Sequence, residues 1–161
     1  MSYIFNAGEV YKIAIEIEEN GKQFYEQSQA GIDSPEVKKL FAELAQQEVD
    51  HKKRFESLLA QLPPESTTPA VWDPENELDK YIKMMADEHI FVAGVKDQLA
   101  QVKDAKSALK MAIEFEKDSV LFFLSLEEAV SGQRDQDLIR TLIKEEQGHL
   151  KRLSLELMKL K

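Results

Sequence analysis

The two ends of the sequence repeat each other at a constant offset of 98 residues. Glu48 and His51 return as Glu146 and His149. Because the offset does not change, no insertion or deletion separates the two copies, and both should adopt the same secondary structure. The sequence therefore predicts two similar units related by approximate two-fold symmetry. Further matches at this offset are Lys12 with Lys110, Glu18 with Glu116, Leu44 with Leu142, and Arg54 with Arg152.

Apolar residues within each copy recur at steps of three and four, which is the spacing of one face of an α-helix. This pattern predicts four long helices, at about residues 7–30, 35–61, 103–130 and 135–160. Ser34 is suited to cap the second helix, because its hydroxyl can accept a hydrogen bond from a free backbone N–H. Pro35 then takes the first helical position, where its missing N–H costs nothing.

The predicted helices pair into two hairpins, at about 7–61 and 103–160, joined by a long crossover at about 62–102. Four of the five prolines lie between Pro63 and Pro74. A shorter helix is expected from Glu75 to about Phe91, capped by Asp73. Two helical hairpins with one long crossover form the ferritin-like topology. We therefore predict an all-α, ferritin-like four-helix bundle that forms a single domain over residues 1–161.

Charge and composition limit the partners of this chain. The formal net charge is -9, with 30 acidic and 21 basic residues. Such a surface repels nucleic acid and anionic membranes, so we expect neither as a partner. The N-terminus lacks the features of a secretory signal, and no apolar run is long enough to span a membrane, so a cytoplasmic protein is expected. The absence of cysteine excludes thiolate nucleophiles and iron–sulfur clusters.

Four glutamates and two histidines occupy core positions of the predicted helices. An unpaired carboxylate in a core is strongly destabilising, so four of them together require cations. Two divalent ions would balance their charge. A glutamate and a histidine three residues apart share one helix face, so each Glu-x-x-His pair is suited to hold metal. The six candidate ligands are Glu18, Glu48, His51, Glu116, Glu146 and His149.

This ligand set predicts a pair of metal ions. One glutamate from each of two helices, with Glu-x-x-His from the other two, is the known pattern of di-iron carboxylate bundles. Carboxylate oxygens with one imidazole per metal suit iron or manganese. We predict two iron ions per chain, with manganese or zinc as alternatives. A helical protein whose six polar residues face water is the other interpretation, but it leaves their shared core stripe unexplained.

The same segments resemble the rubrerythrin-type branch of the ferritin-like superfamily. The resemblance covers nearly the whole chain, and it implies a non-haem di-iron site that reacts with hydrogen peroxide or dioxygen as a peroxidase or ferroxidase. In this resemblance the six candidate ligands match the family's ligand positions one by one. The segments that carry it are AIEIE at 14–18, EVDH at 48–51, AIEFE at 112–116 and EQGH at 146–149.

Two features depart from the family pattern. Full-length rubrerythrin carries a rubredoxin domain with an iron held by four cysteines, whereas this chain has none. The resemblance therefore implies that electrons come from a separate donor protein or small reductant. Ser119 stands where the family has an additional glutamate, so redox-linked exchange of a metal ligand and efficient peroxidase activity are not implied.

Three functions remain open from the sequence. The first is a di-iron oxidoreductase, the second an iron-binding or iron-buffering protein with ferroxidase turnover only, and the third a non-enzymatic helical module with a structural metal such as zinc. A homodimer is expected, because members of the family commonly associate through helix faces.

Three residues outside the ligand set also have an expected role or location. Tyr25 lies two turns beyond Glu18, where it is expected either to hydrogen-bond a ligand carboxylate or to pack as a core aromatic. Its counterpart at the 98-residue offset is Phe123, which has no hydroxyl. His89 on the crossover helix is expected at the surface or at an interface, and Glu145 is expected to be solvated.

Overall fold

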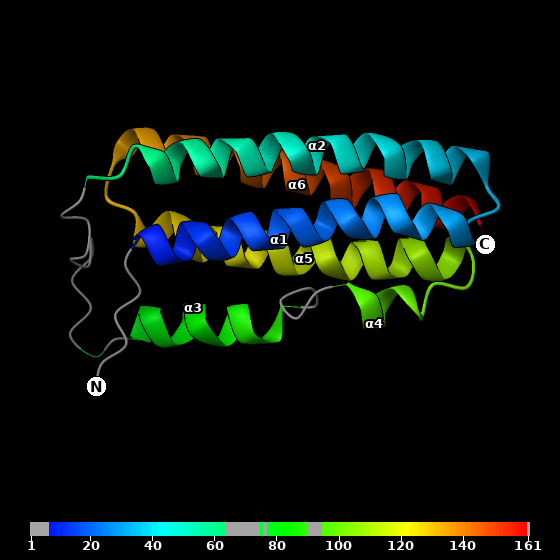
Figure 1. Cartoon of the computed structure of the whole chain (residues 1–161), viewed down its shortest axis with the longest axis horizontal. Coiled ribbons are helices and arrows are strands. Elements are labelled where there is room, and N and C mark those ends of the chain that lie inside the picture. The colour runs from blue at the N-terminus through cyan, green and yellow to red at the C-terminus, as the bar shows by residue number, and fades with distance from the viewer. Residues whose placement is uncertain (1–6, 64–74, 76, 90–94, 161) are drawn as a thin grey trace.

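The computed structural model describes residues 7–63, 75, 77–89 and 95–160, and these residues form helices and connecting turns without any strand. All four predicted long helices are present within this part of the chain. They lie side by side along one axis (Figure 1). Their bounds are Ala7–Gln27 for α1, Pro35–Ala60 for α2, Ala105–Ala129 for α5 and Gln133–Lys159 for α6.

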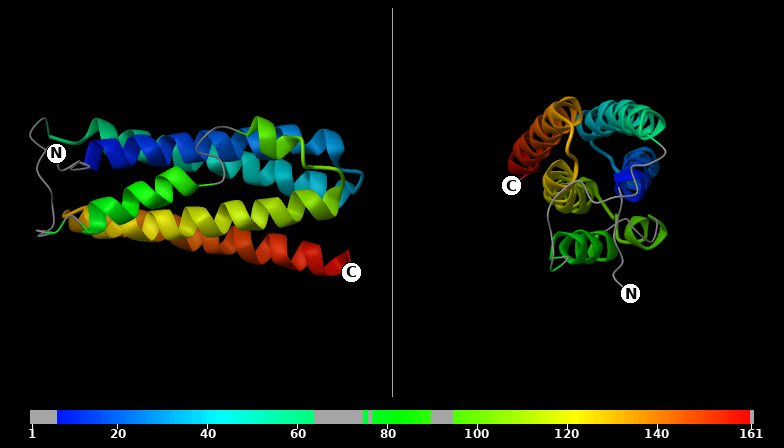
Figure 2. Two further views of the ribbon diagram at one scale, coloured as in Figure 1. Left: turned by 90° about the horizontal axis from the view of Figure 1, so that it is seen from below. Right: turned by 90° about the vertical axis from the view of Figure 1, so that its left-hand side faces the viewer.

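Each half of the internal repeat forms one hairpin. Helix α1 packs chiefly against α2, and α5 packs chiefly against α6, while further contacts join α1 to α5 and α2 to α6. The end view in Figure 2 shows these four helices around a common core. The predicted four-helix bundle is therefore confirmed, and its two hairpins face each other as the repeat predicted.

The helix starts follow the capping residues of the sequence. The Ser34 hydroxyl accepts a hydrogen bond from the Val37 backbone N–H at 3.3 Å, and Pro35 takes the first position of α2 as predicted. Helix α5 begins after Asp104, whose carboxylate accepts from the Ser107 N–H at 2.7 Å. The Ser107 hydroxyl in turn accepts from the Asp104 N–H at 3.1 Å. This reciprocal pair fixes the start of α5 slightly later than predicted.

The described part of the crossover contains two helices where one was predicted. Helix α3 spans Glu77–Glu88, shorter than predicted, and the single-turn helix α4 spans Lys96–Leu99. Helix α4 was not predicted, because one turn is too short to show a helical period. Both helices lie outside the four-helix core (Figures 1 and 2), where α3 contacts α5. Of the predicted proline-rich connection at 63–74 the structure describes only Pro63; the rest of it, with the cap Asp73, and the predicted end at Phe91 lie outside the described residues.

Helix α1 ends earlier than predicted. The α-helix stops at Gln27, and a 3-10 turn, η1, continues over Ser28–Gly31. The Ile32 backbone N–H bonds to the Gln29 carbonyl at 3.3 Å, which closes this tighter turn. Such tightening is common at helix ends, where the last carbonyl groups lack a helical partner.

Aromatic side chains fill the core on both sides of its midpoint. At one end Tyr25 packs edge-on against Phe41, with ring centroids 5.0 Å apart. At the other end Phe55 packs against Phe123 at 5.0 Å. All four are fully buried. Each such side chain stabilises the fold by roughly 1.5–3 kcal/mol through burial, and the two layers cover the two ends of the space between them.

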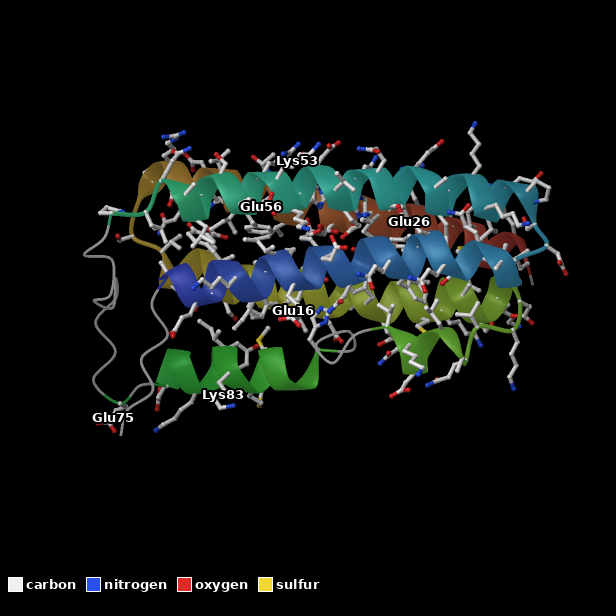
Figure 3. All side chains as sticks on the ribbon, in the orientation of Figure 1. Glu16, Glu26, Lys53, Glu56, Glu75 and Lys83 are labelled. Atoms are coloured by element: carbon white, nitrogen blue, oxygen red, sulfur yellow. The ribbon has the colours of Figure 1, made fainter. Side chains whose placement is uncertain are left out.

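The outer faces of the helices are charged. The labelled side chains of Lys53 on α2 and Lys83 on α3 are exposed and lie on the outside of the molecule (Figure 3). No helix in the described part of the chain combines the length and the hydropathy that a membrane-spanning segment requires.

Candidate metal centre

The six predicted ligands come together between the two aromatic layers. Each long helix contributes at its middle, so the cluster exists only when all four helices are packed. Every one of these side chains is almost completely buried. They are Glu18 from α1, Glu48 and His51 from α2, Glu116 from α5, and Glu146 and His149 from α6.

The six side chains form two overlapping groups of four. Within each group the candidate ligand atoms all lie within 4.8 Å of one another. Glu48 and Glu146 belong to both groups, so each can reach two metal ions. We call the remaining pairs position A, with Glu18 and His51, and position B, with Glu116 and His149. Adding 98 to the residue numbers of position A gives those of position B.

Both histidines direct the same ring nitrogen into the cluster. The His51 Nδ1 lies 2.6 Å from Glu146 Oε1 and 3.5 Å from Glu18 Oε2. The His149 Nδ1 lies 2.9 Å from Glu146 Oε2 and 3.2 Å from Glu116 Oε1. The two rings are nearly parallel, at 9°, with centroids 5.4 Å apart. Nδ1 is therefore the nitrogen available to a metal at both positions.

The cluster contains buried polar atoms that make no hydrogen bond of acceptable geometry to a described residue, although His51 Nδ1 and the Glu146 oxygens lie in ion-pair contact. Each such atom costs about 1–3 kcal/mol when it lacks a partner, and more when it is charged. A cation between these atoms would supply the missing interaction. Four carboxylates and two imidazoles fit two divalent ions such as iron or manganese. The unsatisfied atoms are Glu18 Oε2, Glu48 Oε1, His51 Nδ1, Glu116 Oε2, and Oε1 and Oε2 of Glu146.

Without a cation, three of the four carboxylates of the cluster favour the protonated form. Burial raises the pKa of Glu18 and Glu48 well above the usual range, and repulsion among the carboxylates adds to it. Burial, with repulsion from Glu146, raises the pKa of Glu116 to about 8. Glu146 behaves differently, because the two adjacent histidines overcome its burial and lower its pKa. Glu146 is therefore the carboxylate that ionises first.

The histidines of the cluster favour the charged form. Burial alone would lower the pKa of His51, but the charge of Glu146 overcomes it and raises that pKa to about 10. Burial is likewise outweighed at His149, where hydrogen bonding to Glu116 and Glu146 raises the pKa to about 11. Because metal ligands must be deprotonated, metal binding here has to displace several protons.

Each histidine is held from outside by a residue of the opposite hairpin. The His51 Nε2 lies 2.8 Å from Glu145 Oε2, and the His149 Nε2 lies 2.5 Å from Gln47 Oε1. Because a carboxylate oxygen only accepts, the His51 Nε2 carries the hydrogen and leaves the Nδ1 lone pair for a metal. Gln47 and Glu145 are counterparts at the 98-residue offset.

Glu145 is partly solvated, in agreement with the prediction, but it also makes a contact that was not predicted. Its side chain is 39% exposed, yet it contacts the buried His51. The available signal was spacing, since Gln47 and Glu145 each precede the histidine of their own helix by four residues and so share its face. Spacing did not reveal that each would contact the histidine of the other hairpin.

Tyr25 makes the hydrogen bond that was one of its two expected roles. Its hydroxyl donates to Glu116 Oε1, and the whole residue is buried. The counterpart Phe123 has no hydroxyl to offer. The terminal carboxylate of position B is therefore hydrogen-bonded by a tyrosine, and the internal symmetry is broken at this point.

His89 is buried, so its predicted surface location was wrong. Only 4% of the residue is exposed, and its Nε2 lies 3.3 Å from the Ser119 hydroxyl. Its ring stands edge-on to Phe115, with centroids 5.6 Å apart. The packing of the crossover against α5 causes this burial. Ser119, where the family has its additional glutamate, is thus covered by the crossover.

Gly21 is the counterpart of Ser119 and is required by close packing. A Cβ at Gly21 would overlap the Phe115 ring and lie 3.0 Å from Glu48 Oε2. A larger residue there would displace either the ring or a shared ligand. The residue one turn after the glutamate ligand is therefore glycine at position A, after Glu18, and serine at position B, after Glu116.

A surface pocket lies over the outer edges of both histidines. It has a volume of about 380 Å³. Its lining also includes Asp50 and Gly148, which are counterparts at the offset, as well as Gln47 and Glu145. Water can therefore approach the Nε2 side of the centre, while the aromatic layers cover its ends.

The fold and the cluster together define a ferritin-like bundle with a candidate dimetal-carboxylate centre. The family model described as Rubrerythrin matches residues 9–157. The chain belongs to the rubrerythrin family.

Two solved structures have a similar fold. A protein from Thermotoga maritima, described as a ferritin-like diiron-carboxylate protein, is 23% identical with a TM-score of 0.73 and is matched over 100% of both chains. A hypothetical protein from Pyrococcus furiosus is 21% identical with a TM-score of 0.65, over 96% of this chain and 89% of that one. At these identities the likeness establishes the fold alone. The comparison with curated proteins gives no match.

Proposed function

We propose that this chain is a non-haem di-iron carboxylate oxidoreductase that reacts with hydrogen peroxide or dioxygen. The observation that carries the proposal is the pair of four-residue groups that share Glu48 and Glu146 inside a buried core. Two bound iron ions would supply one-electron redox chemistry and coordination positions for the oxidant. Membership of the rubrerythrin family supports the same activity.

Different residues of the chain have different roles at this centre. Glu48 and Glu146 would hold both metal ions at a fixed spacing, because each belongs to both groups of candidate ligands. Glu18 with His51 and Glu116 with His149 complete them. The aromatic layers exclude water from the ends of the centre, which strengthens electrostatic interactions inside it. Reduction of peroxide to water consumes protons, and the partly exposed Glu145 beside His51 Nε2 offers a path for them.

The partners and location of the protein belong to the same proposal. None of the 161 residues is a cysteine, so a separate donor protein or a small reductant is proposed as the electron source. We also propose a homodimer in the cytoplasm. Exposed apolar side chains on α5 and α6 support association, namely Leu121, Leu124, Leu155 and Met158.

Iron stoichiometry is the direct test. After anaerobic ferrous loading and removal of excess metal, the chain should retain about two iron ions. Glu146→Ala removes a ligand of both positions and should abolish the pair. Glu114→Ala removes the same charge from an exposed site on α5 and should retain it. Two irons in the Glu146→Ala variant would contradict the proposed centre.

The reaction itself is tested by rapid mixing of the diferrous protein with peroxide or dioxygen. Oxidation much faster than that of free ferrous ion, followed by turnover with a reductant, would support the oxidoreductase. Absence of any acceleration would leave a structural or storage metal as the explanation.

An iron-binding or iron-buffering protein with ferroxidase turnover is the second candidate. Ser119, which lies against His89, favours it, because a serine cannot supply the extra carboxylate that the family uses near the centre. This candidate predicts reaction with dioxygen but weak peroxidase turnover, and many irons per assembly. Gel filtration and iron counting of the loaded protein separate it from the first candidate.

A further inference from the structure

We infer that the two metal positions are unequal, and that position A binds a divalent cation more tightly than position B because their surroundings break the internal symmetry in one direction. The inference rests on the proposed function to the extent that both positions hold metal. Glu145, Gln47 and Tyr25 set the order in which the two positions fill.

The ligands themselves do not distinguish the two positions. Each has one terminal glutamate and one histidine, and both share Glu48 and Glu146. The 98-residue offset maps the six ligands onto one another without exception. Any difference in affinity must therefore come from residues that contact the ligands.

The first difference lies behind the histidines. His51 of position A donates its Nε2 hydrogen to the carboxylate of Glu145 at 2.8 Å. His149 of position B faces the neutral amide oxygen of Gln47 at 2.5 Å. A carboxylate behind a ligating imidazole makes the ring a stronger donor to the metal, and it adds a negative charge nearby. An amide orients the ring without adding charge.

Arg54 offsets part of this difference without removing it. Its Nη1 lies 2.9 Å from Glu145 Oε1 and 3.1 Å from Glu145 Oε2. The two partners are about 40% exposed, so water screens their attraction. Glu145 Oε2 still lies on the His51 ring, and Arg54 helps to hold it there. The counterpart Arg152 pairs with Glu43 and not with Gln47.

The second difference lies behind the terminal carboxylates. Tyr25 donates a hydrogen bond to Glu116 Oε1 of position B. Phe123 occupies the corresponding place in the repeat and cannot donate one to Glu18. A carboxylate that already accepts a hydrogen bond is less basic and gives less electron density to a metal. Both differences therefore weaken position B relative to position A.

The experiment is an anaerobic titration of the metal-free full chain with cobalt(II), followed by calorimetry and visible absorption. The wild-type chain should show two binding steps, the first tighter than the second. Glu116→Ala leaves position A intact, and Glu18→Ala leaves position B intact. The single ion should bind about tenfold or more tightly in the Glu116→Ala variant than in the Glu18→Ala variant.

Exchange of the residues behind the histidines tests the cause. Glu145→Gln should weaken the first step by about tenfold with little effect on the second. Gln47→Glu should strengthen the second step. The double variant Gln47→Glu/Glu145→Gln keeps the same composition, and it should reduce or reverse the difference in cobalt affinity between the two steps. Glu114→Gln is the control, because it removes one negative charge, as Glu145→Gln does, but at an exposed site. It should leave the affinity of both steps unchanged. Circular dichroism checks that each variant is folded.

The outcomes separate this inference from the proposed function. Two equal binding steps in the wild-type chain, or a first step unaffected by Glu145→Gln, would overturn the inference and leave the dimetal centre intact. If the wild-type chain bound no cobalt and no iron, the proposed function would fail as well.

Discussion

Tyr25 on α1 donates its hydroxyl hydrogen bond to Glu116 on α5, 91 residues further along the chain. Tyr25→Phe removes this bond and leaves a buried carboxylate oxygen with one partner fewer. We expect a loss of about 1–3 kcal/mol in the free energy of unfolding of the metal-free protein, measured by chemical denaturation.

Tyr11→Phe is the matched control for that change. The Tyr11 hydroxyl donates to Asp135 Oδ2 at 3.0 Å, at the far end of the core from Tyr25. Its removal should cost a comparable amount of stability but leave metal binding unaffected. Tyr25→Phe should also change metal binding: without the hydrogen bond to Glu116, the affinity of the second cobalt-binding step should rise. Equal metal binding in both variants would contradict a role for Tyr25 at the centre.

Gly21→Ala should disturb the candidate metal centre by crowding a core aromatic ring and a ligand carboxylate. The added methyl group meets the Phe115 ring and Glu48 Oε2, so we expect destabilisation by about 1–3 kcal/mol together with weaker metal binding. Gly148→Ala, also within a helix, meets nothing within 4 Å. It should instead stabilise the protein by about 0.5–1 kcal/mol. Thermal and chemical unfolding of the two variants provides the comparison.

Metal binding should release protons and strengthen as pH rises. Near neutral pH the metal-free centre holds protons on Glu18, Glu48 and most of Glu116, and on both histidines, whose pKa values are about 10 and 11. Cations displace these protons, so lowering the pH favours the metal-free form. Calorimetry in buffers of different ionisation enthalpy counts the protons released. A binding heat independent of the buffer would refute this prediction.

His89 should make stability depend on pH below neutrality. Burial lowers its pKa from 6.5 to about 4 in the folded chain. Between these two values the unfolded chain binds a proton that the folded chain does not, so stability falls as the pH falls. The loss by pH 4 should approach about 3 kcal/mol.

The variant His89→Gln isolates this contribution. Glutamine does not titrate, while the other groups of the protein titrate in both chains. The difference in free energy of unfolding between the wild-type chain and the variant should shrink as the pH falls from 6.5 to 4. A difference that stays constant over this range would argue against a buried, neutral His89.

The four long helices and the six clustered residues could be predicted from the sequence because both depend on local regularities. Helical spacing placed Glu48 and His51 on the buried face of α2, and the repeat transferred that result to α6. The crossover was predicted less well. Helix α4 was missed, because one turn shows no helical period, and α3 is shorter than expected. His89 was placed at the surface, because the sequence does not show which part of the bundle the crossover covers.

The helices, the two hairpins and the identity of the buried polar residues could be predicted, since each follows from the spacing of residues along the chain. The contacts of Glu145 with His51, of Gln47 with His149 and of the Tyr25 hydroxyl with Glu116 could not be predicted in this way. These contacts join different helices, and they depend on how far each helix is rotated and shifted against its neighbours. That arrangement is set by the packing of the whole core.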